Sequence, residues 1–251
     1  MTLPHFRASH VLRRIQKGAS SSPVVVETPA GTFVLKLRGA GHGTLALVAE
    51  LVVGSLADRL GLPVPERALV ELEPDFRSDD HNDELADLLT RSIGLNVGFR
   101  LLDGARTPRP EELARVDDDF ALRVLFLDGL TQNLDRTHSN PNILFWNSRP
   151  WLIDHGSSLP FHHDWAQVTE ASPREPESFR HHVFEGRAHL LPRFDEALTK
   201  RLPREALTTA LALVPDELLT ATSSEPPPRM RAAYEAFLWK RLRAPRPFVS
   251  P

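Results

Sequence analysis

Asn-Leu-Asp-Arg-Thr-His-Ser-Asn-Pro-Asn, residues 133–142, and Ile-Asp-His-Gly, residues 153–156, are the two stretches around which the chain is organised. The apolar runs 143–146 and 151–153 lie between them and flank the turn residues 147–150. This pattern predicts a β-hairpin. Such a hairpin would fold Asp154 back towards Asp135 and Asn140. The sequence therefore predicts one cluster of loops that carries aspartate and asparagine side chains.

The spacing inside the first stretch indicates phosphoryl transfer. Four residues separate Asp135 from Asn140, which resembles the catalytic loop of protein kinases, where the Asp orients a hydroxyl and the Asn holds a metal ion. Each residue also has a simpler interpretation, because Asp135 could cap a helix and Asn140-Pro141-Asn142 could form a tight turn. Asn142 competes with Asn140 for the metal-binding role, and the spacing favours Asn140.

A hairpin followed by a helix supplies a second candidate group. The β-branched runs 24–27 and 32–37 flank the turn residues 28–31, which predicts a hairpin that ends near Lys36. Thr44 is the expected N-cap of a helix over residues 45–60, with Gly61 at its C-terminal side. This helix is apolar almost all round, so we expect it to be buried.

Glu50 is the exception in this helix. Its neighbours on the same face are small and uncharged, namely Ala46, Val53, Gly54 and Ala57. A carboxylate buried there requires a cation, and Lys36 comes from the preceding strand. A strand Lys paired with a helix Glu positions the Lys for ATP phosphates in kinases. The alternative is that Lys36 and Glu50 both face solvent.

Gly18-Ala19-Ser20-Ser21-Ser22-Pro23 is a small-residue loop that leads into the first hairpin. Loops of this kind can present backbone N–H groups to phosphate oxygens, although a flexible N-terminal loop has the same composition. Gly39, Gly41 and Gly43 lack the Lys-Ser/Thr ending of a Walker motif, so we interpret them as a strand-to-helix connection.

The composition excludes several classes of protein. The 251 residues are 41% apolar and 25% charged, as in ordinary globular proteins, and the formal net charge is -3. This charge argues against nucleic-acid binding. The absence of cysteine excludes thiolate sites and fits a cytoplasmic protein. No long apolar run predicts a membrane span or signal peptide. The histidine pairs 162–163 and 181–182 lack the partners that a zinc site needs.

Two lobes are predicted from the remaining pattern. Residues 1–103 would form the N-lobe and residues 104–251 the C-lobe, with the Gly/Pro-rich stretch 103–110 between them; a boundary nearer Glu73 is the alternative. Strands are expected at 67–72 and 94–102, a polar loop at 74–84, and no regular element over 157–193. Helices are expected at 85–93, 120–130, 194–202, 204–213 and 229–242.

The ordered set of motifs resembles the HipA-like kinases, and above all their short members that consist of the kinase region alone. The specific marks are Gly61-Leu62-Pro63-Val64-Pro65, the start of the catalytic loop at Asn133-x-Asp135-Arg136, and Asp154-His155-Gly156. The last two marks also look like phosphoinositide kinases. The resemblance implies an α+β, bilobal protein-kinase-like fold, with a small β-rich N-lobe around one main helix and a mainly helical C-lobe.

The resemblance also implies roles for individual residues. Gly18, Ser20, Ser21 and Ser22 would cover the ATP phosphates. Lys36 would contact the α- and β-phosphates and Glu50 would steady it. Asp135 would orient the acceptor hydroxyl, and Asn140 with Asp154 would hold Mg²⁺. Two positions depart from protein kinases, because Asn133 stands in place of the His of His-Arg-Asp and His155 in place of the Phe of Asp-Phe-Gly.

The sequence thus predicts a kinase that uses ATP and Mg²⁺ to phosphorylate a hydroxyl group. The favoured acceptor is a Ser or Thr of a protein substrate. Two alternatives remain: a kinase of the same fold that acts on an inositide or another small alcohol, and a regulatory pseudokinase that binds nucleotide without turnover. The presence of Asp135, Asn140 and Asp154 argues against the second alternative.

Overall fold

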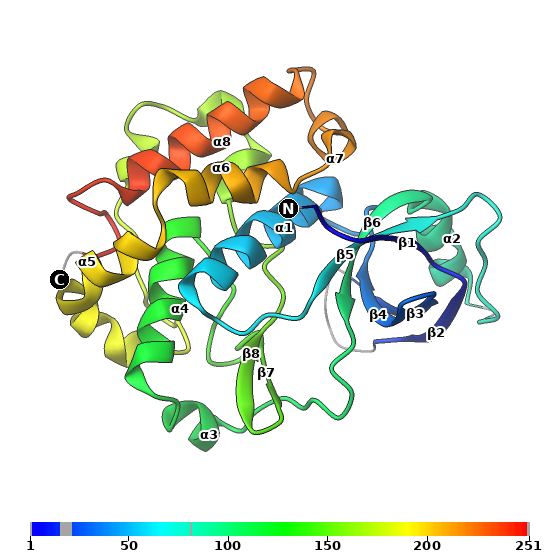
Figure 1. The fold of residues 1–251 in the computed structure, drawn as a ribbon, viewed down its shortest axis with the longest axis horizontal. Coiled ribbons are helices and arrows are strands. Elements are labelled where there is room, and N and C mark those ends of the chain that lie inside the picture. Colours follow the sequence, from blue (N-terminus) through cyan, green and yellow to red (C-terminus); the bar gives the residue numbers. More distant parts are fainter. Residues whose placement is uncertain (1, 16–21, 81, 250–251) are drawn as a thin grey trace.

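A computed structural model describes residues 2–15, 22–80 and 82–249. A β-sheet lies at one end of the molecule and a group of helices at the other (Figure 1). Within the described residues the sheet has six strands in the order β1-β5-β6-β4-β3-β2. Its strands are β1 (His5–Arg7), β2 (His10–Arg14), β3 (Val24–Thr28), β4 (Gly31–Lys36), β5 (Arg67–Leu72) and β6 (Gly94–Arg100).

The predicted hairpin is the pair β3–β4, which runs antiparallel with Val24 opposite Leu35. Strand β4 also pairs with β6, so Lys36 lies opposite Val97. Side chains of one face of the sheet form an apolar cluster with helix α2 (Asp83–Arg91). Strands β1 and β2 were not predicted from the sequence. They are short, basic and partly exposed edge strands, so they lack the alternating apolar pattern on which the prediction depends.

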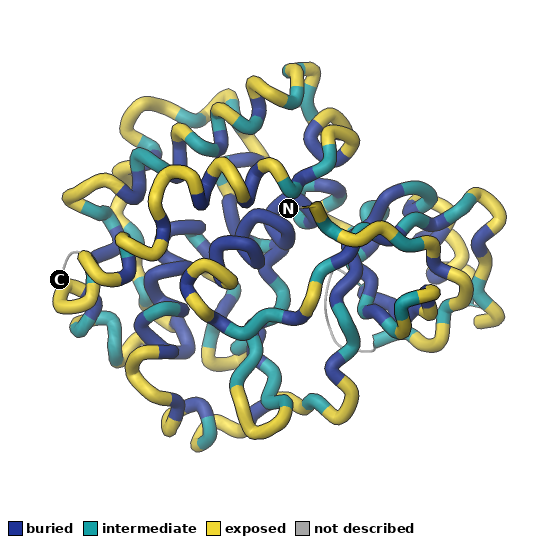
Figure 2. The backbone as a smooth tube through the Cα atoms, in the orientation of Figure 1, coloured by how far each residue is buried: buried dark blue, intermediate teal, exposed yellow. Residues whose placement is uncertain are grey.

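Helix α1 (Gly43–Leu60) links the sheet to the helical part. Its apolar side chains belong to the larger core cluster, together with those of α4 (Asp118–Thr131) and α6 (Arg204–Ala212). Both α1 and α4 run through the buried interior of this part (Figure 2). The lobe boundary near residue 103 stays a prediction, and α1 shares its core with helices on the far side of that boundary.

The helix ends show where the sequence pattern was misleading. Thr44 was expected to cap α1, but His42 is the N-cap residue and Thr44 is buried inside the helix. Gly61 ends α1 in the left-handed conformation as predicted, with φ 72°. Helix α2 begins at Asp83 because the side chain of Asn82 accepts a hydrogen bond from the Leu85 N–H at 2.9 Å.

The remaining elements precede or follow α4 along the chain. The hairpin predicted after the catalytic-loop motif is present as β7 (Ile143–Trp146) and β8 (Arg149–Leu152). Residues 157–190 contain only short 3₁₀ turns, η1 (Pro160–His163), η2 (Trp165–Gln167), η3 (Ser172–Arg174) and η4 (Glu185–Leu190). The other helices are α3 (Pro110–Ala114), α5 (Leu191–Arg201), α7 (Asp216–Thr220) and α8 (Pro227–Leu242). No helix of the described residues is long and apolar enough to cross a membrane.

Candidate active site

Lys36 stands at the end of β4 and points away from the apolar cluster of the sheet. Phe33 and Leu35 of the same strand are buried in that cluster, whereas the Lys36 Nζ lies 3.6 Å from Glu50 Oε1 and 2.6 Å from Asp154 Oδ1. The ion pair between Lys36 and Glu50 is therefore present as predicted. Burial opposes the charge of Lys36, yet the two carboxylates raise the pKa of its ammonium group above the ordinary value.

Glu50 is buried in the middle of α1 and also contacts the second motif. Its Oε2 accepts a hydrogen bond from the backbone N–H of His155 at 3.0 Å. Burial raises the pKa of Glu50 to about 7, and the Lys36 ammonium acts in the opposite direction. Gly156 permits this close approach, because a Cβ there would lie 3.3 Å from the Ala46 Cβ. Glu50 thus holds both Lys36 and the Asp154-His155-Gly156 loop.

The catalytic-loop motif forms a compact set of hydrogen bonds around Asp135. One carboxylate oxygen, Oδ2, accepts from the Asn140 Nδ2 at 3.1 Å and from the Asn142 Nδ2 at 3.0 Å. The backbone N–H of Asp135 donates to the Asn133 Oδ1 at 3.1 Å. The orientation of the carboxylate is therefore fixed from two sides, and both candidate asparagines contact the same oxygen.

Asp154 is returned to this loop by the β7–β8 hairpin, as the sequence predicts. The Ile153 N–H donates to the Asn142 carbonyl at 3.0 Å, which joins the two motifs through their backbones. Asp154 has a positive φ of 57°, a conformation that is sparsely populated for residues other than glycine and common at functional sites. Burial opposes ionisation of Asp154, but the ammonium of Lys36 lowers the pKa of this carboxyl.

Comparison with known proteins identifies the family. A family model described as HipA-like kinase matches residues 8–223. The chain belongs to the HipA-like kinase family. It is also similar in fold to the Helicobacter pylori proinflammatory kinase CtkA, with a TM-score of 0.55 and 12% sequence identity over 95% of this chain and 93% of that one. The predicted α+β, kinase-like fold is thereby confirmed. No curated protein matches the chain.

A magnesium ion in this HipA-like kinase would be held by oxygen atoms of the two motifs. Carboxylate and amide oxygens are the ligands that Mg²⁺ prefers. Asn140 and Asn142 both direct their amide nitrogens to Asp135, so their amide oxygens face elsewhere. No three His, Asp or Glu side chains of the described residues form a metal site by themselves. Asp154 would be one ligand and an asparagine oxygen the other, and the choice between Asn140 and Asn142 stays a prediction.

The predicted phosphate loop is described only at its end. Gly18, Ser20 and Ser21 lie outside the described residues. Ser22 lies two residues before the start of β3 and has a positive φ of 35°. It lines a cavity of about 450 Å³ with the glycine-containing connection 39–41, and the charged residues of the lining are of both signs: Arg14, Arg91, Glu84 and Asp87. The phosphate-binding role of this loop stays a prediction of the family resemblance.

Three residues that matter for the site were given no role from the sequence. Asp128 of α4 and Arg136 of the catalytic loop form a fully buried ion pair with 2.7 Å between Oδ2 and Nε. Arg241 of α8 is also buried, and it donates to the carbonyls of Gly129 at 2.7 Å and Leu130 at 3.1 Å. A charged residue within an otherwise apolar helix had identified Glu50, and the same signal was available for Asp128.

Proposed function

We propose that this HipA-like kinase transfers the γ-phosphoryl group of ATP, in the presence of Mg²⁺, to the hydroxyl of a Ser or Thr in a protein. The observation that carries the proposal is the position of Lys36. Its ammonium lies between a helix carboxylate, Glu50, and a loop carboxylate, Asp154, and a hairpin of four-residue strands joins that loop to Asp135. The groups that would serve as cation, metal ligand and hydroxyl-orienting carboxylate are therefore connected by one ion pair and one short hairpin.

Lys36 would neutralise charge on the ATP phosphates. Its pKa is raised by Glu50 and Asp154 in spite of burial, so it stays an ammonium ion at neutral pH. Glu50 has the positioning role in this proposal, because it contacts both Lys36 and the His155 backbone. Phosphoryl transfer requires mainly such positioning and neutralisation of charge, with little covalent chemistry from the protein.

Asp135 would orient the acceptor hydroxyl. The two asparagine amides hold Oδ2, which leaves Oδ1 as the oxygen that faces an incoming hydroxyl. Asn140 and Asp154 would be ligands of the metal ion. A bound Mg²⁺ would supply charge neutralisation to the phosphates.

The proposed function is tested by incubating the purified chain with γ-labelled ATP, Mg²⁺ and a protein extract. We expect label in the chain itself or in a protein of the extract. The variant Asp135→Asn should reduce transfer by about 10²- to 10⁴-fold, the range for loss of a positioned acid–base group. Asp79→Asn removes an exposed carboxylate outside the site and is the matched control.

Three outcomes distinguish the alternatives. Label in a small alcohol or inositide, and in no protein, would replace the acceptor while the kinase assignment remains. A rise in melting temperature with ATP and Mg²⁺ but no transfer to any acceptor would indicate a regulatory module. If ATP with Mg²⁺ neither binds nor raises the melting temperature, the proposed function is wrong.

A further inference from the structure

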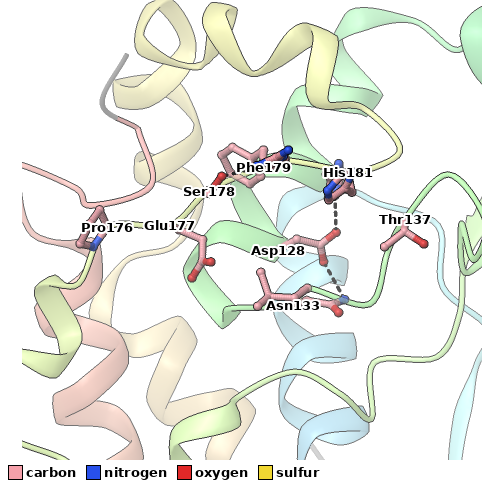
Figure 3. Close-up of a pocket in the computed structure, with 11 residues that line it drawn as sticks. Asp128, Asn133, Thr137, Pro176, Glu177, Ser178, Phe179 and His181 are labelled. Atoms are coloured by element: carbon pink, nitrogen blue, oxygen red, sulfur yellow. Dashed lines mark hydrogen bonds and ion pairs between the residues drawn. The ribbon is translucent and has the colours of Figure 1, made fainter.

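A buried polar network lies beneath the catalytic loop, and its centre is the carboxylate of Asp128. Figure 3 shows this carboxylate between Asn133 and the histidine segment 181–182. Asp128 Oδ1 accepts from the Asn133 Nδ2 at 3.1 Å, and Oδ2 accepts from the Arg136 Nε at 2.7 Å and the His182 Nε2 at 3.0 Å. All four side chains are at most 5% exposed. A buried carboxylate with this many donors is a rigid anchor.

The network reaches both motifs of the candidate active site. Asn133 accepts the backbone N–H of Asp135. The Arg136 guanidinium donates to the Asn142 carbonyl at 2.7 Å and to the Ile153 carbonyl, next to Asp154, at 3.5 Å. A displacement of Asp128 or Arg136 would therefore move the hydroxyl-orienting group and the proposed metal ligand together.

The two hydrogen bonds of His182 indicate one tautomer of its ring. Its Nδ1 accepts the backbone N–H of Phe184 at 3.0 Å, so this nitrogen carries no hydrogen. The hydrogen of the neutral ring must then be on Nε2, which donates to Asp128. Two backbone hydrogen bonds fix the same segment to the catalytic loop. The His138 N–H donates to the His181 carbonyl and the Val183 N–H donates to the Arg136 carbonyl, and together they form the antiparallel bridge between Thr137 and His182.

We infer that His182 is a positioning residue for phosphoryl transfer. Its Nε2–H holds Asp128, and Asp128 with Arg136 holds the catalytic loop and the Asp154 loop at the separation that the reaction requires. This inference rests on the proposed function, and it assigns His182 no contact with ATP or acceptor. Loss of the hydrogen bond would loosen the loops without removing any group that binds the substrates.

A cavity lies beside the network, and we expect it to let a variant with a smaller side chain at position 182 fold. It has a volume of about 440 Å³ and is bordered by Asp128, Asn133, Leu134, Thr137 and the segment 176–182. A smaller side chain at position 182 would let water from this side reach the Asp128 carboxylate. Water can satisfy the oxygen that the imidazole leaves, but it does not hold the segment in place. Turnover should therefore be affected more than folding.

Two substitutions separate the two hydrogen bonds of His182. In His182→Gln the Nε2 amide can still reach Asp128. In His182→Asn the Oδ1 can still accept the Phe184 N–H, but the shorter side chain cannot reach Asp128. We expect kcat to fall about 10- to 100-fold in His182→Asn, the cost of a misplacement near 1 Å, while the KM for ATP stays within about threefold. His182→Gln should keep kcat within about threefold of wild type. His189→Gln replaces an exposed histidine and is the matched control.

The outcomes separate this inference from the proposed function. A wild-type chain without transfer activity contradicts the proposed function. An active wild type with unchanged kcat in His182→Asn, or with equal losses in the Gln and Asn variants, overturns the role of His182. If His182→Asn does not fold, ¹⁵N NMR of the wild-type imidazoles at pH 7 is decisive for the hydrogen-bond arrangement. A neutral ring protonated on Nε2 supports it, and a ring protonated on Nδ1 overturns it.

Discussion

Glu50 and Asp128 are two buried carboxylates whose pKa values are shifted in opposite directions. Each lies on a central helix, α1 or α4, each is 1% exposed, and each faces a cation. Burial raises the pKa of Glu50 to about 7. Burial also opposes ionisation of Asp128, yet Arg136 and His182 lower the pKa of that carboxyl to about 2. The neighbours of Asp128 therefore compensate the cost of burying its charge, whereas the neighbours of Glu50 compensate that cost only in part.

The difference comes from the number of donors and from competition for the cation. Asp128 accepts hydrogen bonds from the guanidinium of Arg136, the imidazole of His182 and the amide of Asn133. Glu50 has one backbone N–H and shares Lys36 with Asp154, which is 1.0 Å closer to the Nζ (3.6 Å less 2.6 Å). Asp128 thus has the properties of a permanent anchor, whereas Glu50 can gain or lose a proton near neutral pH.

The largest expected effect is the loss of the anchor. Asp128→Asn would leave the buried guanidinium of Arg136 without its counter-charge, and breaking such a pair costs about 3–5 kcal/mol. We expect this decrease in the free energy of unfolding from urea titrations at pH 7. Asp119→Asn on the same helix is the control, since its carboxylate is 61% exposed and exposed pairs contribute about 1 kcal/mol or less. Similar losses in the two variants would contradict the interpretation of Asp128 as an anchor.

The contrast also explains how far the sequence could lead. Glu50 could be paired in advance because its cation comes from the strand that directly precedes α1. Asp128, in contrast, has a partner that is distant in sequence, His182. This histidine lies in the stretch 157–193, where no periodicity predicts the path of the chain. Only the fold brings residues 128 and 182 together. The order of Lys36, Glu50, Asp135, Asn140 and Asp154 was sufficient for the kinase-like fold, and their proposed roles stay predictions.

Other misses have equally local causes. The predicted helix boundaries differ from the observed ones by up to three residues. At α1 the difference arises because Thr44 has the hydroxyl of a typical N-cap residue but lies inside the helix. Strands β1 and β2 depend on pairing with β5 and β3, so their own composition carries little signal. Arg241 of the last helix was given no role from the sequence, and it is buried where the α4 carbonyls accept its hydrogen bonds.

The pH dependence of stability tests the other half of the comparison. The pKa of Glu50 rises from an ordinary value near 4.5 to about 7 in the folded chain. Between these two values the folded state binds a proton that the unfolded state has released. The stability that this proton contributes is complete below about pH 4.5 and is lost as the pH rises to about 7.

Glu50→Gln removes this titration and keeps the shape of the protonated side chain. We expect the free energy of unfolding of wild type, minus that of the variant, to fall on the order of 2 kcal/mol between pH 5 and pH 8. Urea titrations at four pH values measure this difference. Glu66→Gln, at a carboxylate that is 76% exposed, should give a difference that does not change with pH. A flat difference for Glu50→Gln as well would show that Glu50 is ionised throughout.

The smallest effect concerns the backbone that Glu50 holds. Gly156→Ala would place a Cβ 3.3 Å from the Ala46 Cβ and 3.5 Å from Glu50 Oε1, so the Asp154 loop must move away from α1 by a few tenths of an ångström. We expect a loss of about 1 kcal/mol in the free energy of unfolding. Gly186→Ala is the matched control, because nothing lies within 4 Å of a Cβ there.

Gly156→Ala also tests how the loop affects the pKa of Glu50. The shift of the loop should weaken the hydrogen bond from the His155 N–H to Glu50, which would leave that carboxylate with fewer donors and raise its pKa further. The decrease in stability with rising pH should then extend to higher pH in Gly156→Ala than in wild type. An unchanged pH profile would mean that the loop does not control the proton on Glu50.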